Sequence, residues 1–173
     1  YATIFHLIFI GFGLLLSLSM YIMMIKFNVP ALISAILTGL FIISPGTILM
    51  ENHLLYTYPV TSLLCLSALL LHRLLNTNTA RHGLLFYMSL ATITLTAHMF
   101  HVSWFILLWI MSFFFWNNKK KFFIASCIPL LLVLSLSVKN LLIFGQLSSS
   151  SWLGFSFSKL TTMALSYQER ALL

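Results

Sequence analysis

Long apolar runs follow one another along this chain, and their length restricts the fold more than any other feature. A helix needs about 20 apolar residues to cross a hydrocarbon layer about 30 Å thick. The stretch from Leu84 to Trp116 has 33 residues, too many for one simple span, and we divide it near His98 to His101. The apolar runs are Thr3–Ile25, Val29–Leu49, Tyr58–Leu75, Leu84–Trp116 and Phe122–Ser137. We predict an all-α chain, a polytopic transmembrane helical bundle of five to six membrane segments, one of them broken near His98–His101.

The composition indicates lipid rather than water as the surrounding solvent. Hydrophobic residues make up 61% of the chain and charged residues 6%, and the mean hydropathy is +1.05. Soluble domains carry roughly 25% charged residues, so a surface this poor in charge would not stay dispersed in water. The net charge of +7 does not indicate nucleic-acid binding, because no basic face is interleaved with polar surface. We expect membrane lipid as a partner and no nucleic acid.

The positive charges lie in short connections between the apolar runs and predict the orientation. If the segments alternate, six cations lie on one side of the membrane and three on the other. Cytoplasmic loops carry an excess of Lys and Arg, which places the larger group in the cytoplasm. The larger group is Lys26, Arg73, Arg81, Lys119, Lys120 and Lys121, and the smaller group is Lys139, Lys159 and Arg170.

The end of the chain has a different composition from the rest. The first part of residues 146–173 is rich in serine and contains one Trp and two Phe, a mixture that suits the membrane interface. We therefore predict a transmembrane helical domain over residues 1–145. Residues 146–173 are predicted to form an external interfacial loop and the start of a further helix.

The polar side chains best suited to binding or catalysis are predicted on the external face. One connection contains Glu51, Asn52, His53, Tyr56 and Tyr58, and the other contains Lys139, Asn140, Gln146 and Ser148–Ser151. A carboxylate, amides and an ammonium near aromatic rings suit a sugar or a phosphate headgroup. Two plainer interpretations stay open. Polar residues occur wherever helices leave lipid, and the Lys139 ammonium can extend to the interface from a helix end.

The sequence Ser44-Pro45-Gly46 precedes the first of these connections and predicts a break in the second apolar run. A break frees backbone carbonyls, which lipid tolerates only where protein or a water-filled cavity covers them. A crevice open to the outside is therefore expected there. The sequence has no Walker loop, no His-Glu-x-x-His, no Gly-x-Ser-x-Gly and no paired carboxylates.

His98 and His101 leave two interpretations open. They are three residues apart inside apolar sequence, where histidines are costly and tend to face a cavity or a partner. A bis-histidine haem needs ligands from separate helices, so a hydrogen-bonded role at a helix break is favoured over haem or metal ligation. Cys65 and Cys127 lie in apolar segments without pairing or metal spacing. The sequence specifies no cofactor.

Two stretches of the chain carry a resemblance to a known family. The first is SPGTILMENHLLYTYP, followed by a leucine-rich span and LLHRLL, and the second is SVKNLLIFGQLSSSSWLG. Both resemble polytopic glycosyltransferases of the GT-C superfamily, which includes lipid-carrier-dependent mannosyl- and aminoarabinosyltransferases. The resemblance covers about Pro30 to Gly154 and implies a helical enzyme of the bacterial inner membrane. Such an enzyme passes a sugar from a polyprenyl-phosphate carrier to an external acceptor.

The chain departs from this family at the catalytic acid. Family members carry an acidic residue, often one of a pair, in the first external loop, whereas this chain has no acidic pair. The resemblance therefore implies a fragment whose catalytic acid lies outside this chain, and no catalytic residue is assigned. Glu51 is expected at the rim of the substrate crevice. The substrate-binding residues would be Glu51, Asn52, His53, Tyr56, Lys139 and Asn140, with Lys139 near the carrier phosphate and Glu51 and Asn52 near the sugar.

Three other functions remain as alternatives. A chain with few charges and many Phe and Met side chains suits a non-enzymatic accessory subunit packed against other membrane subunits. A haem or redox subunit would use His98 or His101. A transporter is less well supported, because substrate paths normally contain buried ionisable residues.

Overall fold

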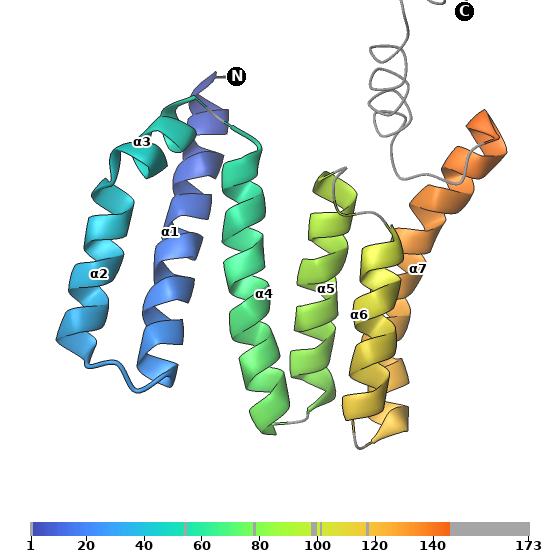
Figure 1. Cartoon of the computed structure of the whole chain (residues 1–173). Helices are drawn as coiled ribbons and strands as arrows, with labels where there is room; N and C mark the ends of the chain where they lie inside the picture. The colour runs from blue at the N-terminus through green and yellow to red at the C-terminus, as the bar shows by residue number, and fades with distance from the viewer. Residues whose placement is uncertain are drawn as a thin grey trace, which may run out of the picture.

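The computed structural model describes residues 2–53, 55–77, 79–97, 100, 102–116 and 118–145, and the regular structure within these ranges is all helical (Figure 1). The helices are α1 (Ala2–Lys26), α2 (Ala31–Ile43), α3 (Pro45–Asn52), α4 (Thr57–Thr77), α5 (Ala80–Thr96), α6 (Val102–Phe115) and α7 (Lys119–Phe144). The predicted all-α class is confirmed for the described part of the chain. Residues 146–173, the predicted interfacial segment, lie outside it.

Three of the described helices, α1, α4 and α7, are long and apolar enough to cross a membrane. The α2 and α3 helices pass the same test together, bent by 53°, so the number of candidate spans rises to four if this pair counts as one. The α6 helix is apolar but has only 14 residues, and α5 has 17. The described residues thus supply three to four candidate spans, and the larger number of five to six stays a prediction.

With the short α3 left aside, each helix runs opposite to the one before it along the chain, so α1 and α4 run in the same direction and α2 runs against both (Figure 1). The α4 helix packs against both α1 and α5, and α5 also packs against α6 and α7. The α2 helix lies at one edge of this row, where it packs against α1 and α3. A buried hydrogen bond of 2.8 Å between the hydroxyls of Ser67 and Ser89 joins α4 to α5. Such bonds between helices in a membrane contribute about 0.6 kcal/mol on average.

The largest cluster of buried apolar side chains among the described residues lies where α4, α5, α6 and α7 meet. Its fully buried side chains include Tyr87, Phe105, Phe122 and Val133. Many large apolar side chains elsewhere point outward; Leu32 on α2 is 73% exposed and Leu142 on α7 is 80% exposed. Lipid acyl chains are as apolar as leucine and would cover such side chains without cost, so this pattern fits helices that stand in a membrane.

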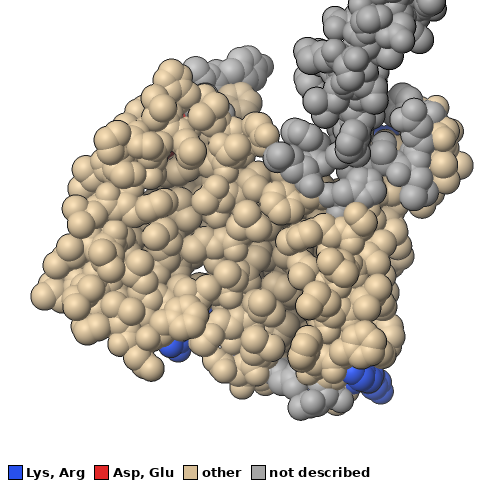
Figure 2. Space-filling model, viewed as in Figure 1, with Lys and Arg blue, Asp and Glu red and all other residues tan. Residues whose placement is uncertain are grey.

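One end of the row carries most of the cations. The α1 helix ends at Lys26, and the aromatic ring of Phe27 lies 5.9 Å from that of His72 in the last turns of α4. In Figure 2, the Lys and Arg side chains in view at this end border a broad uncharged face. The alternating helix directions thus bring the predicted larger group of cations to one end, whereas its cytoplasmic location stays a prediction. This group contains Lys26, Arg73, Arg81, Lys119, Lys120 and Lys121.

The long apolar stretch from Leu84 to Trp116 is divided between two helices. The α5 helix ends at Thr96, where the Ala97 N–H donates to the Ile93 carbonyl at 2.9 Å, and α6 begins at Val102. His98 and His101, which we predict at this division, lie outside the described residues.

The α7 helix begins and ends at residues suited to helix termini. Asn118 Oδ1 accepts a hydrogen bond from the Lys121 N–H at 3.2 Å, which caps the first turn. Gly145 ends the helix with a φ of 68°, a left-handed conformation that favours glycine. Because α7 continues to Phe144, Lys139 and Asn140 lie within the helix.

Candidate functional site

The break between α2 and α3 is stabilised by hydrogen bonds among its own residues. Pro45 occupies the first turn of α3, and Ser44 accepts a hydrogen bond from the Thr47 N–H at 3.4 Å. The carbonyl of Phe41, which the break frees from its helical partner, accepts from the Thr47 hydroxyl at 2.9 Å and from the Ser44 N–H at 3.2 Å. The bend therefore satisfies this freed carbonyl with local donors, and it turns α3 across the end of the bundle.

The turn places Glu51 on the last turn of α3, half-buried against α4. Its carboxylate Oε2 accepts a hydrogen bond from the Tyr58 hydroxyl at 3.2 Å. Tyr58 is only 2% exposed, and its ring stacks on that of Phe9 in α1, with 6.3 Å between the ring centroids. Tyr58 is expected from the sequence in the external connection, whereas the structure buries it in the first turn of α4. A rigid buried phenol thus holds the carboxylate.

Gly13 on α1 makes room for this pair. A Cβ atom at this position would lie 2.7 Å from the Tyr58 hydroxyl oxygen and 3.5 Å from Glu51 Oε2. Glycine inside a helix costs about 1 kcal/mol relative to alanine, and here the close approach of Tyr58 explains its presence. Gly13 is not among the site residues predicted from the sequence, where its only signal is a glycine inside a long apolar run.

The other predicted site residues lie at the same end of the bundle but on different helices. Asn52 and His53 end α3, and both are exposed, as is Tyr56 just before α4. Lys139 is exposed and Asn140 half-buried on α7. Because α3 packs against α1, α2 and α4, whereas α7 packs against α5 and α6, the two groups of residues are separated by α5.

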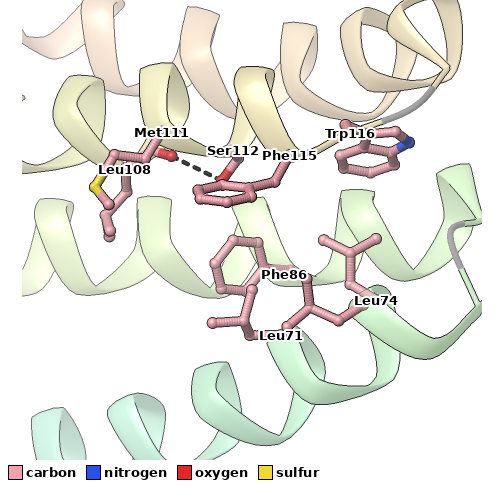
Figure 3. A pocket seen from close by; sticks show the side chains of 9 residues that line it. Leu71, Leu74, Phe86, Leu108, Met111, Ser112, Phe115 and Trp116 are labelled. Atoms are coloured by element: carbon pink, nitrogen blue, oxygen red, sulfur yellow. Dashed lines mark hydrogen bonds between the residues drawn. The ribbon is translucent and has the colours of Figure 1, made fainter.

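A pocket of about 330 Å³ lies between α4, α5 and α6, in the half of the bundle that carries the cations. Figure 3 shows its wall: Phe86 of α5 lies between the leucines of α4 and the side chains of α6. The polar side chains that line the pocket include Ser112, whose hydroxyl already donates to the Leu108 carbonyl at 2.7 Å. The pocket suits an apolar chain and lacks groups for a sugar or a phosphate.

The fold and this site define a helical chain whose apolar helices fit an integral membrane protein and whose carboxylate is held between helices at one end. The chain matches no protein-family model, no curated protein and no solved structure. Among the described residues, no three His, Cys, Asp or Glu side chains come together as a metal site requires. Cys65 and Cys127 are free thiols.

Replacing Gly13 with alanine is expected to lower the free energy of unfolding by up to about 2 kcal/mol. The added methyl group displaces Tyr58 at a cost of roughly 1–3 kcal/mol, partly offset by about 1 kcal/mol of helix propensity. The measurement is unfolding by SDS titration in mixed micelles, followed by far-ultraviolet circular dichroism.

Two further variants separate this cause from a general effect of alanine in α1. At Gly11 a Cβ atom would meet nothing within 4 Å, so Gly11→Ala should not destabilise the protein. In a Tyr58→Phe background the clashing oxygen is gone, and Gly13→Ala should cost much less. Equal costs of Gly13→Ala in the two backgrounds would contradict the assigned contact.

Proposed function

We propose that this chain is part of a GT-C-type glycosyltransferase that moves a sugar from a polyprenyl-phosphate carrier to an external acceptor. The observation that carries the proposal is the half-buried Glu51 carboxylate, held by the Tyr58 hydroxyl at 3.2 Å. A sugar presents several hydroxyl donors, and a carboxylate accepts hydrogen bonds at about four lone-pair positions. The bond from Tyr58 uses one of these positions and fixes the direction of the others.

The remaining residues of the site receive roles according to their chemistry. Asn52, His53 and Tyr56 present amide, imidazole and phenol groups next to Glu51, and they bind the sugar or its acceptor. Lys139 carries an ammonium, which with the Asn140 amide binds the carrier phosphate. Because α5 lies between the two groups, the headgroup of the carrier extends across the end of α5.

The charge distribution supports the direction of the reaction. Six of the described cations gather at the end of the bundle opposite α3, whereas Lys139 lies at the α3 end, and an excess of Lys and Arg is typical of the cytoplasmic side. In a bacterial inner membrane this orientation turns Glu51 outward. The sugar is then delivered on the external side, where the acceptor is.

Two variants are expected to affect different parts of the carrier. With undecaprenyl phosphate and undecaprenyl phosphomannose as probes, Lys139→Ala should weaken binding of both lipids about 10- to 100-fold, because hydrogen bonds to charged groups contribute roughly 1.5–3 kcal/mol. Glu51→Gln should weaken binding of the phosphomannose alone, because only that lipid carries sugar hydroxyls. Native mass spectrometry of the purified protein measures both affinities.

The matched control is Lys26→Ala, which removes a lysine from the opposite end of the bundle and should leave both affinities unchanged. Phosphatidylglycerol provides the lipid control, since it is anionic but has neither a polyprenyl chain nor a sugar. If undecaprenyl phosphate binds no better than phosphatidylglycerol, or if Lys139→Ala has no effect on either probe, the proposal is wrong.

A further inference from the structure

The apolar pocket between α4, α5 and α6 is accessible from outside the bundle. Its rim contains Leu75 of α4 and Phe115 of α6, which are 67% and 73% exposed, whereas Phe86 of α5 at its base is 4% exposed. Its volume of about 330 Å³ lies within the range of roughly 300–1,000 Å³ that is usual for ligand pockets. In a membrane the surroundings of such a rim are acyl chains, so an acyl chain can enter the pocket.

The pocket reaches the end of the bundle where the cations gather. Trp116, which follows the last residue of α6, lies at one end of the pocket, and Leu108 lies at the other (Figure 3). On α4 the lining extends to Leu75, close to the end of that helix at Thr77. Tryptophan is enriched at the depth of the lipid headgroups. A lipid with an acyl chain in the pocket therefore has its headgroup beside the helix ends.

A lysine lies next to this end of the pocket. The Lys119 Nζ donates to the carbonyl of Phe113 and lies 4.3 Å from the centroid of the Phe113 ring. Phe113 directly follows Ser112, which lines the pocket. An ammonium group has three N–H donors, and the Phe113 carbonyl uses one of them. The others are oriented by this contact and can bind a phosphate.

The six cations at this end face no carboxylate from the described part of the chain. Glu51, the one acidic side chain among the described residues, lies at the opposite end of the bundle. Basic pockets between membrane helices bind anionic lipid headgroups, and clusters of Lys and Arg beside a membrane are attracted to anionic lipids. An apolar pocket next to uncompensated positive charge matches a molecule that combines an acyl chain with a phosphate.

We propose that an anionic glycerophospholipid binds here, with one acyl chain in the pocket and its phosphate at Lys119. A zwitterionic phospholipid is a poorer match, because its own cation offsets its phosphate. The polyprenyl-phosphate carrier is also a poorer match, because the residues proposed for its headgroup, Glu51 and Lys139, lie at the other end of the bundle. The inference does not depend on the proposed enzymatic function.

Trp116 provides a direct probe of this site, because bromine atoms on an acyl chain quench the fluorescence of an indole ring that they contact. Replacing Trp104, Trp109 and Trp152 with phenylalanine leaves Trp116 as the one tryptophan. The protein is placed in phosphatidylcholine vesicles that contain a minor fraction of phosphatidylglycerol. Brominated phosphatidylglycerol should quench Trp116 more strongly than the same amount of brominated phosphatidylcholine. Lys119→Gln should lower this preference about fivefold, the effect of one Lys near an anionic membrane surface.

Two control variants separate a site from general attraction to the membrane surface. Lys26→Gln removes a cation from the same end of the bundle but from α1, which does not line the pocket, and it should keep the preference. Ser112→Phe places a ring in the pocket and should reduce quenching by both brominated lipids. Ile110→Phe adds the same ring at a position that is 44% exposed and outside the lining, and it should not.

The outcomes distinguish this proposal from its alternatives. Equal quenching of Trp116 by the two brominated lipids overturns it, as does an equal loss of preference in Lys26→Gln and Lys119→Gln. The comparison of these two exposed lysines changes no core residue, so it decides the question even if Ser112→Phe does not fold. Lys139→Ala should leave the quenching unchanged, which keeps this site separate from that proposed for the carrier.

Discussion

Replacing Phe122 with alanine is expected to lower the free energy of unfolding by roughly 3–5 kcal/mol. The Phe122 side chain is 0% exposed at the start of α7, and it is surrounded by aromatic rings. In a membrane the driving force for helix association is van der Waals packing rather than exclusion of water. The cavity left by alanine removes these contacts, which no lipid chain restores. The neighbouring rings are those of Tyr87, Trp109, Phe113, Trp116 and Phe123, at centroid distances of 5.9, 5.2, 5.5, 5.6 and 5.5 Å.

The control for this prediction is Phe114→Ala on α6. Phe114 is 75% exposed, so in a bilayer it exchanges one set of lipid contacts for another. SDS titration followed by circular dichroism should show a large shift of the unfolding midpoint for Phe122→Ala and a small shift for Phe114→Ala. Similar shifts for the two variants would mean that the aromatic cluster around Phe122 does not stabilise the fold.

The helical class could be predicted because the length of an apolar run is a local property. The division of residues 84–116 was predictable for the same reason, since 33 residues exceed one span. The gathering of cations at one end followed from alternation of the segments. The number of spans was harder to predict, because α5 and α6 have only 17 and 14 residues and hydropathy does not reveal how far a helix continues.

Which face of each helix is buried could not be read from hydropathy. Phe122 and Phe123 are adjacent and chemically identical, yet Phe122 is 0% exposed and Phe123 is 50% exposed. In a soluble protein polar residues would mark the outer face, but lipid removes that distinction. A more useful signal is the position of small hydroxyl residues: Ser34 and Thr38, four apart on α2, are both buried.

The site was partly predictable for a related reason. Glu51 is one of only two acidic residues in the chain, so it could be selected as a candidate site residue from the sequence alone. Its hydrogen bond with Tyr58 spans seven residues and depends on the bend at Ser44 and the turn before α4. Gly13 on α1 lies against Tyr58 and Glu51 of other helices. A contact between helices of this kind cannot be predicted from a single sequence.

Replacing Gly83 with valine is expected to lower the free energy of unfolding by about 3 kcal/mol, in the upper range for overpacking a core. Gly83 lies in the first turn of α5, where a Cβ atom would overlap the ring of Trp116 and lie 3.0 Å from Ala125 Cβ on α7. Trp116 is 4% exposed and cannot rotate away without leaving the core. The glycine thus lets a tryptophan fill the space between α5 and α7.

Gly83→Ala and Gly39→Ala separate this packing effect from the helix propensity of glycine. Alanine should stabilise a helix by about 1 kcal/mol at a site with free space, and a Cβ atom at Gly39 meets nothing within 4 Å. In dilute mixed micelles Gly39→Ala should therefore be neutral or stabilising, whereas Gly83→Ala should destabilise and Gly83→Val should destabilise more. In a Trp116→Phe background, which shortens the ring that reaches Gly83, the cost of Gly83→Ala should fall. An unchanged cost would show that Trp116 is not the side chain for which the glycine makes room.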